Sequence, residues 1–305
     1  MSREALSFPA YMPFLLFSKE GIRVKLAFTK MHGCGNNYIY FNCFDQTVPD
    51  PESLSIKLSE PHFGIGGDGI ILISPSDRAD AQMRIFNADG SEGKMCGNGI
   101  RCVGKYLYDN GMVGGRTTIT IDTLSGVKTL ELHVSDGKMQ TARVDMGAAI
   151  LEPAKIPVNM AGSSVIDAPL VVDEKVYHVT CVSMGNPHCV IFFNEDDVDD
   201  LDLSRLGPKF EHHPLFPERI NTEFVNVLPD GSLKMRVWER GSGETWACGT
   251  GACATGVAAC LNGFCKPDTD ITVHLRGGDL TIRYTTETVF MTGAAATVFK
   301  GEIEL

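Results

Sequence analysis

The sequence predicts an α+β fold made of two similar domains, on the basis of three observations. The chain has 305 residues, about twice the usual length of one domain. Short strand-like runs greatly outnumber helical segments, which is typical of α+β proteins. The two halves of the chain also share an internal repeat, and such a repeat indicates a duplicated unit.

The strands are predicted where β-branched and aromatic residues alternate between turns rich in Gly, Pro and Asp, from residue 25 onward. Examples, in chain order, are residues 38–44, 69–74, 82–86, 117–122, 140–146, 176–183, 189–193, 223–228 and 233–238. Helical patterns occur in three places, at about 51–59, from Cys96 to about 110, and from Cys248 to about 263. The segment 152–169 holds three prolines and is predicted to be a linker or long loop.

The internal repeat aligns residues 83–99 with residues 235–251 without a gap. Six of the seventeen positions are identical, where chance gives about one. A second similarity lies upstream, where Gly35-Asn36 and Gly185-Asn186 each precede an apolar strand. We therefore expect two domains related by a pseudo-twofold axis, one formed by 25–147 with 293–305 and the other by 148–292. Residues 1–24 are treated as an N-terminal extension of unassigned role, because their apolar stretch lacks the features of a secretory signal.

Composition and charge exclude several classes of protein. The formal net charge of −11 disfavours a nucleic-acid partner, which would be bound through its phosphates. No apolar run reaches the roughly 18 residues of a membrane-spanning helix. Ten cysteines are too few for a disulfide scaffold of this size, and their spacing matches no structural zinc site, so a reducing, cytoplasmic setting and no metal are expected. The glycine-rich run 64–69 lacks the strand–turn–helix context of a dinucleotide site and is predicted to be a turn.

The repeat places one cysteine in the same local setting in each half. Cys96 and Cys248 both follow a strand and a polar turn, and each precedes a helix that begins Gly-x-Gly. Unpaired amide N–H groups at a helix N-terminus bind carboxylates, and the same positive end lowers a thiol pKa below its free value of about 8.5. A pseudo-twofold axis would bring the two thiols face to face across a cleft.

Two opposed thiols suit inversion of a carbon centre. A thiolate on one side removes a proton, a thiol on the other side delivers one, and the roles exchange in the reverse direction. Amide groups at the helix ends can stabilise the carbanion that forms beside a carboxylate. The other eight cysteines are expected to be small buried side chains: Cys34, Cys43, Cys102, Cys181, Cys189, Cys253, Cys260 and Cys265.

The chain resembles the diaminopimelate epimerase family from about residue 28 to residue 305. The stretches that carry the resemblance are 30–36, 84–92, 95–102, 184–189, 216–221, 239–244 and 247–253. The resemblance implies that each domain is a mostly antiparallel, barrel-like sheet around a central helix, with the active site in the cleft between domains. It also implies cofactor-independent interconversion of LL- and meso-diaminopimelate, for lysine and peptidoglycan synthesis, by a protein that forms a homodimer.

The family's functional residues transfer position by position. The resemblance implies that Cys96 and Cys248 are the acid–base pair, with Cys96 acting on the L centre and Cys248 on the D centre. His188 and Glu239 would tune the thiols. The α-carboxylate cradle would be formed by Gly97, Asn98, Gly249 and Thr250, and the remaining substrate contacts by Asn36, Asn87, Asn186, Asn221, Glu239 and Arg240.

Three alternatives remain open at this stage. The first is another pyridoxal-independent amino-acid racemase of the same fold, acting on histidine, proline or glutamate. The second is a non-catalytic two-lobed protein that binds amino acids, which would not need the paired cysteines. The third is a redox or metal-binding dithiol, which would not need helix ends that bind a carboxylate.

Overall fold

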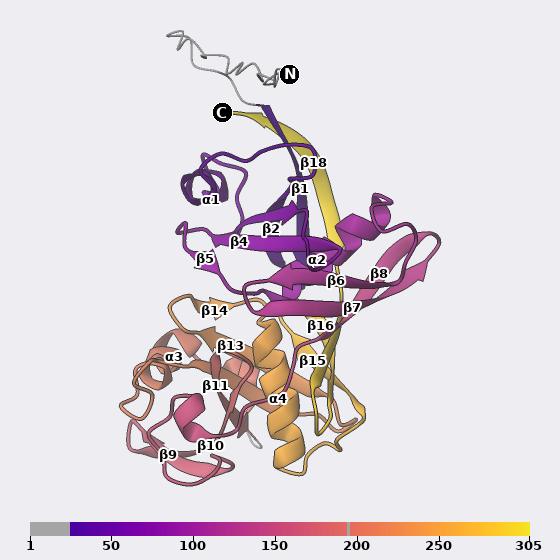
Figure 1. The fold of residues 1–305 in the computed structure, drawn as a ribbon. Helices are drawn as coiled ribbons and strands as arrows, with labels where there is room; N and C mark the ends of the chain where they lie inside the picture. The colour runs from indigo at the N-terminus through magenta and orange to yellow at the C-terminus, as the bar shows by residue number, and fades with distance from the viewer. Residues whose placement is uncertain (1–24, 194–195) are drawn as a thin grey trace, which may run out of the picture.

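The computed structural model describes residues 25–193 and 196–305, so the predicted extension 1–24 lies outside the described residues. The chain forms two stacked lobes, and its C-terminal strand returns to the first lobe (Figure 1). The first lobe contains β1 (Lys25–Gly33), β2 (Asn36–Asn42), α1 (Pro51–Ser59), β3 (Gly69–Ser74), β4 (Ala81–Asn87), β5 (Glu92–Gly93), α2 (Gly97–Asp109), β6 (Thr118–Thr123), β7 (Gly126–Ser135) and β8 (Lys138–Asp145).

The second lobe follows directly. It contains η1 (Pro153–Lys155), β9 (Ala168–Val172), β10 (Lys175–Ser183), β11 (Pro187–Phe193), η2 (Val198–Asp200), α3 (Leu203–Glu211), β12 (Asn221–Val227), β13 (Leu233–Glu239), β14 (Gly243–Thr245), α4 (Gly249–Leu261), β15 (Asp270–Leu275) and β16 (Gly278–Tyr284). Two strands complete the chain, β17 (Val289–Ala294) and β18 (Ala296–Glu304). None of the helices in these described residues is long and apolar enough to span a membrane.

The two lobes share one sheet topology, which confirms the duplication predicted from the repeat. In the first lobe β1–β2 is antiparallel, β2–β3 parallel, β3–β4 antiparallel, β4–β6 parallel, and β6–β7–β8 antiparallel. In the second lobe β10–β11, β11–β12, β12–β13, β13–β15 and β15–β16–β17 follow the same order of senses. β18 pairs with β1 as β9 pairs with β10.

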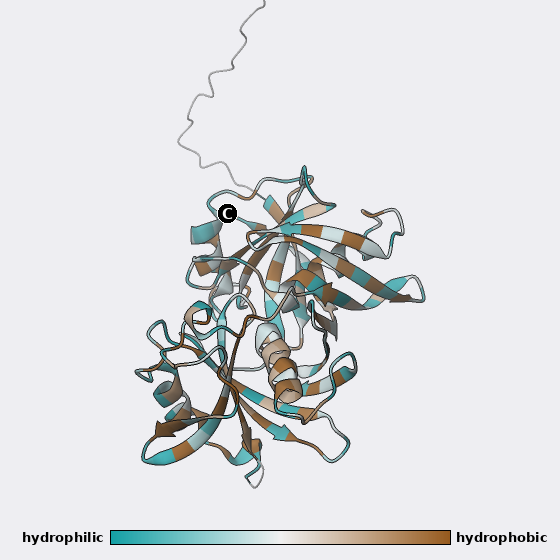
Figure 2. Ribbon diagram, turned by 60° about the horizontal axis from the view of Figure 1, so that its bottom comes forward, coloured by the Kyte–Doolittle hydropathy of each residue, from teal (hydrophilic) through white to brown (hydrophobic). Residues whose placement is uncertain are grey.

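One long helix packs inside each curved sheet. α2 buries Ile100, Val103 and Leu107 against the strands of the first lobe. α4 is apolar on almost every side, and Figure 2 shows its mostly pale and brown colouring at the centre of the second lobe. A helix that is apolar all round belongs in a core, because no face of it favours water. The predicted α+β class, with a barrel-like sheet around each central helix, is therefore confirmed.

Strand β17 makes the two sheets continuous. It pairs with β16 on one edge and with β8 on the other, both antiparallel. Met291 on β17 is fully buried, and its side chain lies beside both Gly97 and Gly249, at the starts of α2 and α4. The two central helices therefore begin close to one buried side chain at the junction between lobes.

Every predicted helix and strand corresponds to an observed one, with bounds that differ by a few residues at most, whereas β1, β5, β7, β9 and β14–β18 lie outside the runs named in advance. α1 and β3 have the predicted bounds, and α2 and α4 begin one residue after the cysteines. The prediction omits α3, which contains Pro208; Asp202 caps that helix by accepting a hydrogen bond from the Arg205 amide at 3.2 Å. The segment 152–169 is irregular after η1, as predicted, except that β9 begins at Ala168.

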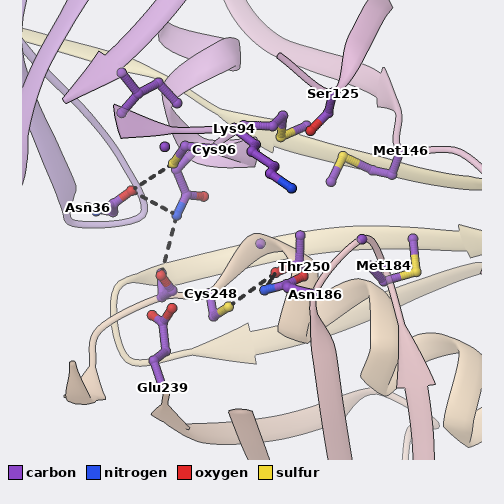
Figure 3. Close-up of a pocket in the computed structure, with 18 of the residues that line it drawn as sticks. Asn36, Lys94, Cys96, Ser125, Met146, Met184, Asn186, Glu239, Cys248 and Thr250 are labelled. Atoms are coloured by element: carbon purple, nitrogen blue, oxygen red, sulfur yellow. Dashed lines mark hydrogen bonds between the residues drawn. The ribbon is translucent and has the colours of Figure 1, made fainter. Parts of the chain in front are cut away.

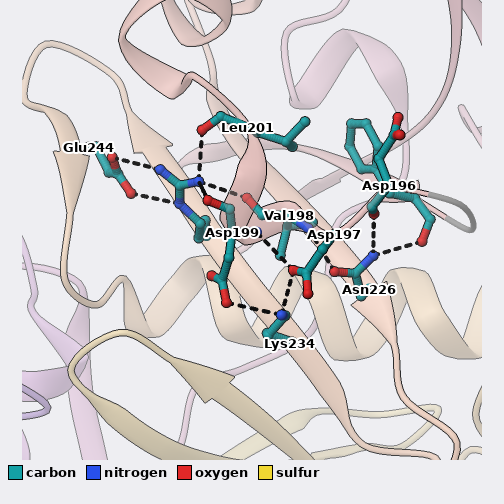
Figure 4. Close-up of polar contacts among 10 residues, drawn as sticks. Asp196, Asp197, Val198, Asp199, Leu201, Asn226, Lys234 and Glu244 are labelled. Carbon is teal, nitrogen blue, oxygen red and sulfur yellow. Dashed lines mark hydrogen bonds and ion pairs between the residues drawn. The ribbon is translucent and has the colours of Figure 1, made fainter.

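A polar network links β13 and β14 to the segment 197–201 (Figure 4). The Arg236 guanidinium donates to Glu244 Oε1 at 2.9 Å and to the carbonyl groups of Val198 and Leu201 at 2.7 and 2.8 Å. In the first lobe Arg84 donates to Glu92 Oε1 at 2.7 Å. The identical Arg and Glu of the sequence repeat therefore form the same ion pair in each lobe, on the hairpin that leads to the cysteine.

Candidate active site

A cavity of about 580 Å³ lies between the lobes. Both halves of the repeat contribute to its wall, which is consistent with the predicted interdomain site (Figure 3). Of the predicted site residues, those that line it are Asn36, Asn87, Cys96, Gly97 and Asn98 from the first lobe, and Asn186, Glu239, Arg240, Cys248, Gly249 and Thr250 from the second. His188 and Asn221 do not line it.

Each of the two cysteines caps the N-terminus of its central helix. Cys96 Sγ accepts a hydrogen bond from the Gly99 amide at 3.3 Å, and Cys248 Sγ accepts one from the Gly251 amide at 3.4 Å. The backbone of both cysteines is extended, as is usual at an N-cap. The sulfurs and the free amides of two helix ends therefore face one cavity from opposite lobes.

The glycines after the cysteines are needed for packing as well as for ligand approach. A Cβ on Gly97 would lie 2.7 Å from Met291 Cε, and a Cβ on Gly251 would lie 2.6 Å from Glu223 Oε1. Real Cβ atoms do not approach other atoms so closely, so both positions exclude alanine without local rearrangement.

Asn36 and Asn98 surround the Cys96 sulfur. Asn36 donates from Nδ2 to Asp68 Oδ2 at 2.8 Å, which turns its carbonyl oxygen toward the site. That oxygen accepts a hydrogen bond from Cys96 Sγ at 3.3 Å and another from Asn98 Nδ2 at 3.3 Å. Asp68 was not predicted as a site residue; it lies in the glycine-rich run 64–69 that we predicted to be a turn.

The Cys248 sulfur has a different set of neighbours. Thr250 Oγ1 lies 3.5 Å from Cys248 Sγ and accepts a hydrogen bond from Asn186 Nδ2 at 3.2 Å. Glu239 accepts a hydrogen bond from the Thr245 hydroxyl. Burial raises the pKa of the Glu239 carboxyl, against the lowering effects of Thr245 and of the neighbouring Cys248.

Burial raises the pKa of both thiols in the ligand-free protein. For Cys96, the amides of Asn98 and Gly99 and the charge of Arg101 lower the pKa, but burial outweighs them. For Cys248, burial is reinforced by the negative charges of Glu239 and Glu223, and its pKa lies well above the ordinary value. The predicted lowering by the helix ends is therefore wrong for this state, because loss of solvation exceeds the effect of the amides.

Arg101 is a buried cation directly beneath the first cysteine turn. It is completely buried and donates to the Gly97 carbonyl at 3.0 Å, to Asn98 Oδ1 at 3.0 Å and to the Ala294 carbonyl at 3.3 Å. None of its hydrogen-bond partners in the described residues is a carboxylate. Arg101 was not predicted as a site residue, although an arginine one turn inside an otherwise buried helix was a signal for a role.

His188 and Glu223 form a completely buried pair behind the Cys248 side of the cavity. His188 Nδ1 lies 2.7 Å from Glu223 Oε1, and Nε2 lies 3.0 Å from Asn186 Oδ1. Both side chains have no exposed surface. His188 was predicted as a site residue, but Glu223 was not. The available signal was an acidic residue among apolar neighbours in a predicted strand.

The remaining predicted residues differ in their accessibility. Asn221 donates to the Pro187 carbonyl at 2.7 Å and accepts from the Arg240 amide at 2.9 Å, so both ends of its side chain bind main chain. The Arg240 side chain lines the cavity and donates to the Glu218 carbonyl at 3.0 Å. Asn87 lines the cavity and donates to Ser91 Oγ at 3.0 Å. Two further cations that sequence reasoning missed, Lys94 and Lys128, also line the wall.

The cysteines and acidic groups do not form a metal centre within 25–193 and 196–305. All ten cysteines are free, and no group of three His, Cys, Asp or Glu side chains in those ranges could hold a metal ion. The chemistry available in the cavity is that of two thiols, helix-end amides, one buried carboxyl and several amides and cations.

Comparisons with known proteins agree with this geometry. The family model described as diaminopimelate epimerase matches residues 28–152 and 180–298. The diaminopimelate epimerases of Agathobacter rectalis and Acetivibrio thermocellus are each 55% identical to this chain, covering 92% of it and 100% and 99% of those proteins. Among solved structures, a hydroxyproline epimerase from Agrobacterium vitis shares the fold with a TM-score of 0.66 at 16% identity, over 92% of this chain and 91% of that one. The chain therefore belongs to the diaminopimelate epimerase family.

Proposed function

We propose that the protein is a diaminopimelate epimerase that interconverts LL- and meso-2,6-diaminopimelate by proton transfer between two cysteines. The observation that carries the proposal is the pair of thiols, Cys96 and Cys248, at the N-termini of two pseudo-symmetric helices that face one cavity. The similarity to named diaminopimelate epimerases over most of the chain supplies the substrate class.

In the proposed reaction one sulfur, as thiolate, removes the α-proton and the other, as thiol, protonates the opposite face. Cys96 acts on the L centre and Cys248 on the D centre. The α-carboxylate lies against the amides of 97–99 and 249–251, where two helix N-termini stabilise the charge that builds up on the carbanion. No external cofactor takes part in this scheme.

Burial raises the pKa of both thiols in the substrate-free protein. Substrate binding must therefore lower the pKa of one thiol before that thiol can ionise. The substrate's α-ammonium group brings a positive charge into the cavity, and a nearby cation favours the thiolate. The Arg101 charge beneath the first helix end acts in the same direction on Cys96.

The distal half of the substrate also carries a carboxylate and an ammonium group. We assign its carboxylate to Arg240, which lines the cavity, with Asn87 as a further contact. Asn221 holds the Arg240 main chain from behind and so acts as a positioning residue. Asn36 and Asn186 contact the reacting half, and Glu239 and His188 tune the thiols.

The wider organisation follows the same proposal. We place the division between lobes at 147/148 and within β17 at 292/293, supported by the return of β18 to β1.

We propose that the protein is cytoplasmic and forms a homodimer. We assign β18 to the dimer interface, because its Val298 and Phe299 side chains are 55% and 46% exposed. Sedimentation of the wild-type protein and of Val298→Asp tests this: the wild type should be a dimer and the variant should dissociate more readily.

The experiment that tests the activity is incubation with LL-diaminopimelate in deuterated water without added cofactor. We expect meso product with solvent deuterium at the inverted α-carbon, and loss of turnover in both Cys96→Ala and Cys248→Ala. Cys265→Ala removes a cysteine that does not line the cavity and should retain turnover. Full turnover in either active-site variant would contradict the two-thiol mechanism.

Two further measurements separate the alternatives. Parallel assays with proline, glutamate and histidine should show no turnover; turnover of one of them in place of diaminopimelate would identify a different racemase. Inhibition by a carbonyl-trapping reagent would indicate a pyridoxal cofactor and would contradict the proposed mechanism.

A further inference from the structure

A continuous chain of side-chain contacts links Glu223 to the Cys248 sulfur. It begins with the buried pair, in which Glu223 Oε1 lies 2.7 Å from His188 Nδ1. His188 Nε2 lies 3.0 Å from Asn186 Oδ1, and Asn186 Nδ2 donates to Thr250 Oγ1 at 3.2 Å. Thr250 Oγ1 lies 3.5 Å from Cys248 Sγ (Figure 3 shows the contacts around Thr250).

The geometry of the first two contacts sets the protonation of His188. With the Asn186 amide oriented as in the structure, both ring nitrogens face acceptor oxygens, a carboxylate and an amide carbonyl, and this arrangement is satisfied when both nitrogens carry a proton. A buried imidazolium requires a counter-charge, and the Glu223 carboxylate supplies it. Glu223 Oε2 has no hydrogen-bond partner among the described residues, so the histidine is the main partner of this carboxylate.

The first lobe has no equivalent of this pair. Glu223 is opposite Val190 in the parallel β11–β12 ladder, and Ile71 is opposite Tyr40 at the equivalent position of β2–β3. A Cβ on Gly99 would contact Ile71 just as a Cβ on Gly251 would contact Glu223. The position behind the cysteine turn is therefore apolar in one lobe and carries a carboxylate in the other, and the two thiols are not chemically equivalent.

We propose that Glu223 is a positioning residue of this site, which holds His188 doubly protonated so that the chain through Asn186 and Thr250 presents a hydroxyl donor to Cys248 Sγ. The effect of Glu223 on turnover rests on the proposed function. The hydrogen-bond directions from Glu223 to Cys248 do not depend on which substrate is bound. No proton travels along the chain: each group keeps its protons, and only the donor and acceptor directions are set.

The direction of the chain decides which form of Cys248 it favours. With His188 Nε2–H donating to Asn186 Oδ1, the Asn186 amide N–H donates to Thr250, whose hydroxyl proton is free to face the sulfur and stabilise a thiolate. A neutral His188 with its proton on Nδ1 would instead accept from the Asn186 amide. The Asn186 carbonyl would then accept from Thr250, and the Thr250 oxygen would favour a protonated Cys248.

The effect of the hydrogen-bond direction on the Cys248 pKa differs in sign from the effect of the Glu223 charge. The titratable groups that face the His188–Glu223 pair are Glu239, Cys248 and Cys189. The negative charge of Glu223 by itself raises the pKa of Cys248, so removing that charge alone would make the thiol ionise more easily. If the hydrogen-bonded chain is lost, we expect the opposite change, in which the Cys248 thiol ionises less easily.

The decisive variant is Glu223→Gln, assayed by alkylation of Cys248 in the full-length, substrate-free protein and quantified by peptide mass spectrometry across pH. We expect the alkylation midpoint to move to higher pH, with alkylation at pH 8 about tenfold slower, as loss of one hydrogen bond to a charged group implies. A midpoint that stays unchanged or moves to lower pH would overturn the proposal. Glu211→Gln removes another buried carboxylate of the same lobe and should leave the Cys248 midpoint unchanged.

A double variant shows whether the effect travels through the chain. Thr250→Ala removes the hydroxyl that contacts the sulfur, so adding Glu223→Gln to it should cause no further shift of the Cys248 midpoint. A shift equal to that seen with Thr250 present would indicate action through space and would refute the chain.

A measurement on the unaltered protein covers the case in which Glu223→Gln does not fold. In protein labelled with ¹⁵N-histidine, we expect both ring nitrogens of His188 to carry a proton at neutral pH. His188→Gln identifies its signals by their loss. An unprotonated ring nitrogen at that pH would overturn the proposal, whereas failure to turn over diaminopimelate would refute only the proposed substrate.

Discussion

Asn98 and Ala247 join the two cysteine turns across the cavity. Asn98 Nδ2 donates to the Ala247 carbonyl, the residue before Cys248, at 3.4 Å. The other end of the same amide accepts from Arg101 at 3.0 Å, which fixes its orientation. One side chain of the first lobe thus connects a buried cation, its own cysteine turn and the turn of the second lobe.

Asn98→Asp should separate stability from activity. The new carboxylate would pair with Arg101, but its second oxygen would face the Asn36 and Ala247 oxygens that Asn98 Nδ2 now donates to. These effects oppose each other, so we expect the free energy of unfolding to change little. The same negative charge would repel the substrate α-carboxylate and raise the pKa of Cys96, so kcat/KM should fall by about two orders of magnitude. Urea unfolding and steady-state assays measure the two effects. Equal activity in the variant would remove Asn98 from the carboxylate cradle.

Arg101→Met should raise the pKa of Cys96 further, because the Arg101 charge lowers it in the wild-type protein. The methionine also leaves the Gly97 and Asn98 oxygens without their donor, which should reduce stability by about 3 kcal/mol. The Cys96 alkylation midpoint and urea unfolding report the two effects. Arg116→Met, at an exposed arginine of the same lobe, serves as control. An unshifted Cys96 midpoint would exclude an electrostatic role for Arg101.

The protein should lose stability as pH rises above about 9. Burial raises the pKa of Cys102 to about 11 and of Cys253 to about 12, from an ordinary value of 9.0. The unfolded chain then releases these protons first, so the stabilising effect is complete below the ordinary pKa and declines up to the folded-state values. Each such thiol contributes about 1.4 kcal/mol per pH unit in that range.

Cys253→Ala tests this dependence. Between pH 9 and 11, urea unfolding of the variant should show a slope smaller by about one proton than that of the wild type, whatever the change in stability at pH 7. Slopes that coincide would show that Cys253 ionises equally in both states.

Gly251→Ala should disturb both packing and the second thiol. Its Cβ would lie 2.6 Å from Glu223 Oε1 and 3.2 Å from Cys248 Cβ, in a core with no space for it. We expect a loss of about 1–3 kcal/mol in unfolding free energy and a large fall in kcat. In Gly93→Ala the nearest atom would be at 3.7 Å, so that control should retain its stability. Wild-type behaviour of Gly251→Ala would show that the Glu223 side chain moves away without cost.

Much of the fold was predictable because its signals are local. The helix starts at Cys96 and Cys248 follow from the cysteine–glycine turns, and α1 follows from Pro51 at its first position. The repeat predicted the duplicated topology. α3 was missed because Pro208 suggests a break, whereas Trp238 and its neighbours pack over that helix and stabilise it.

By itself the sequence determined the two cysteine turns and the duplication, since each depends on residue type and short spacing, and its resemblance to the family pointed to most of the residues that line the cavity. The tertiary structure decided the rest, because those properties depend on atoms far apart in the chain. Burial raises the thiol pKa values against the helix ends, and none of the Arg101 partners within 25–193 and 196–305 is a carboxylate. His188 meets Glu223 from another strand, and Asn98 reaches Ala247 across the cavity. The direct pairing of β11 with β12 brings His188 to Glu223, and the pairing of β17 with both β16 and β8 joins the lobes that carry Asn98 and Ala247.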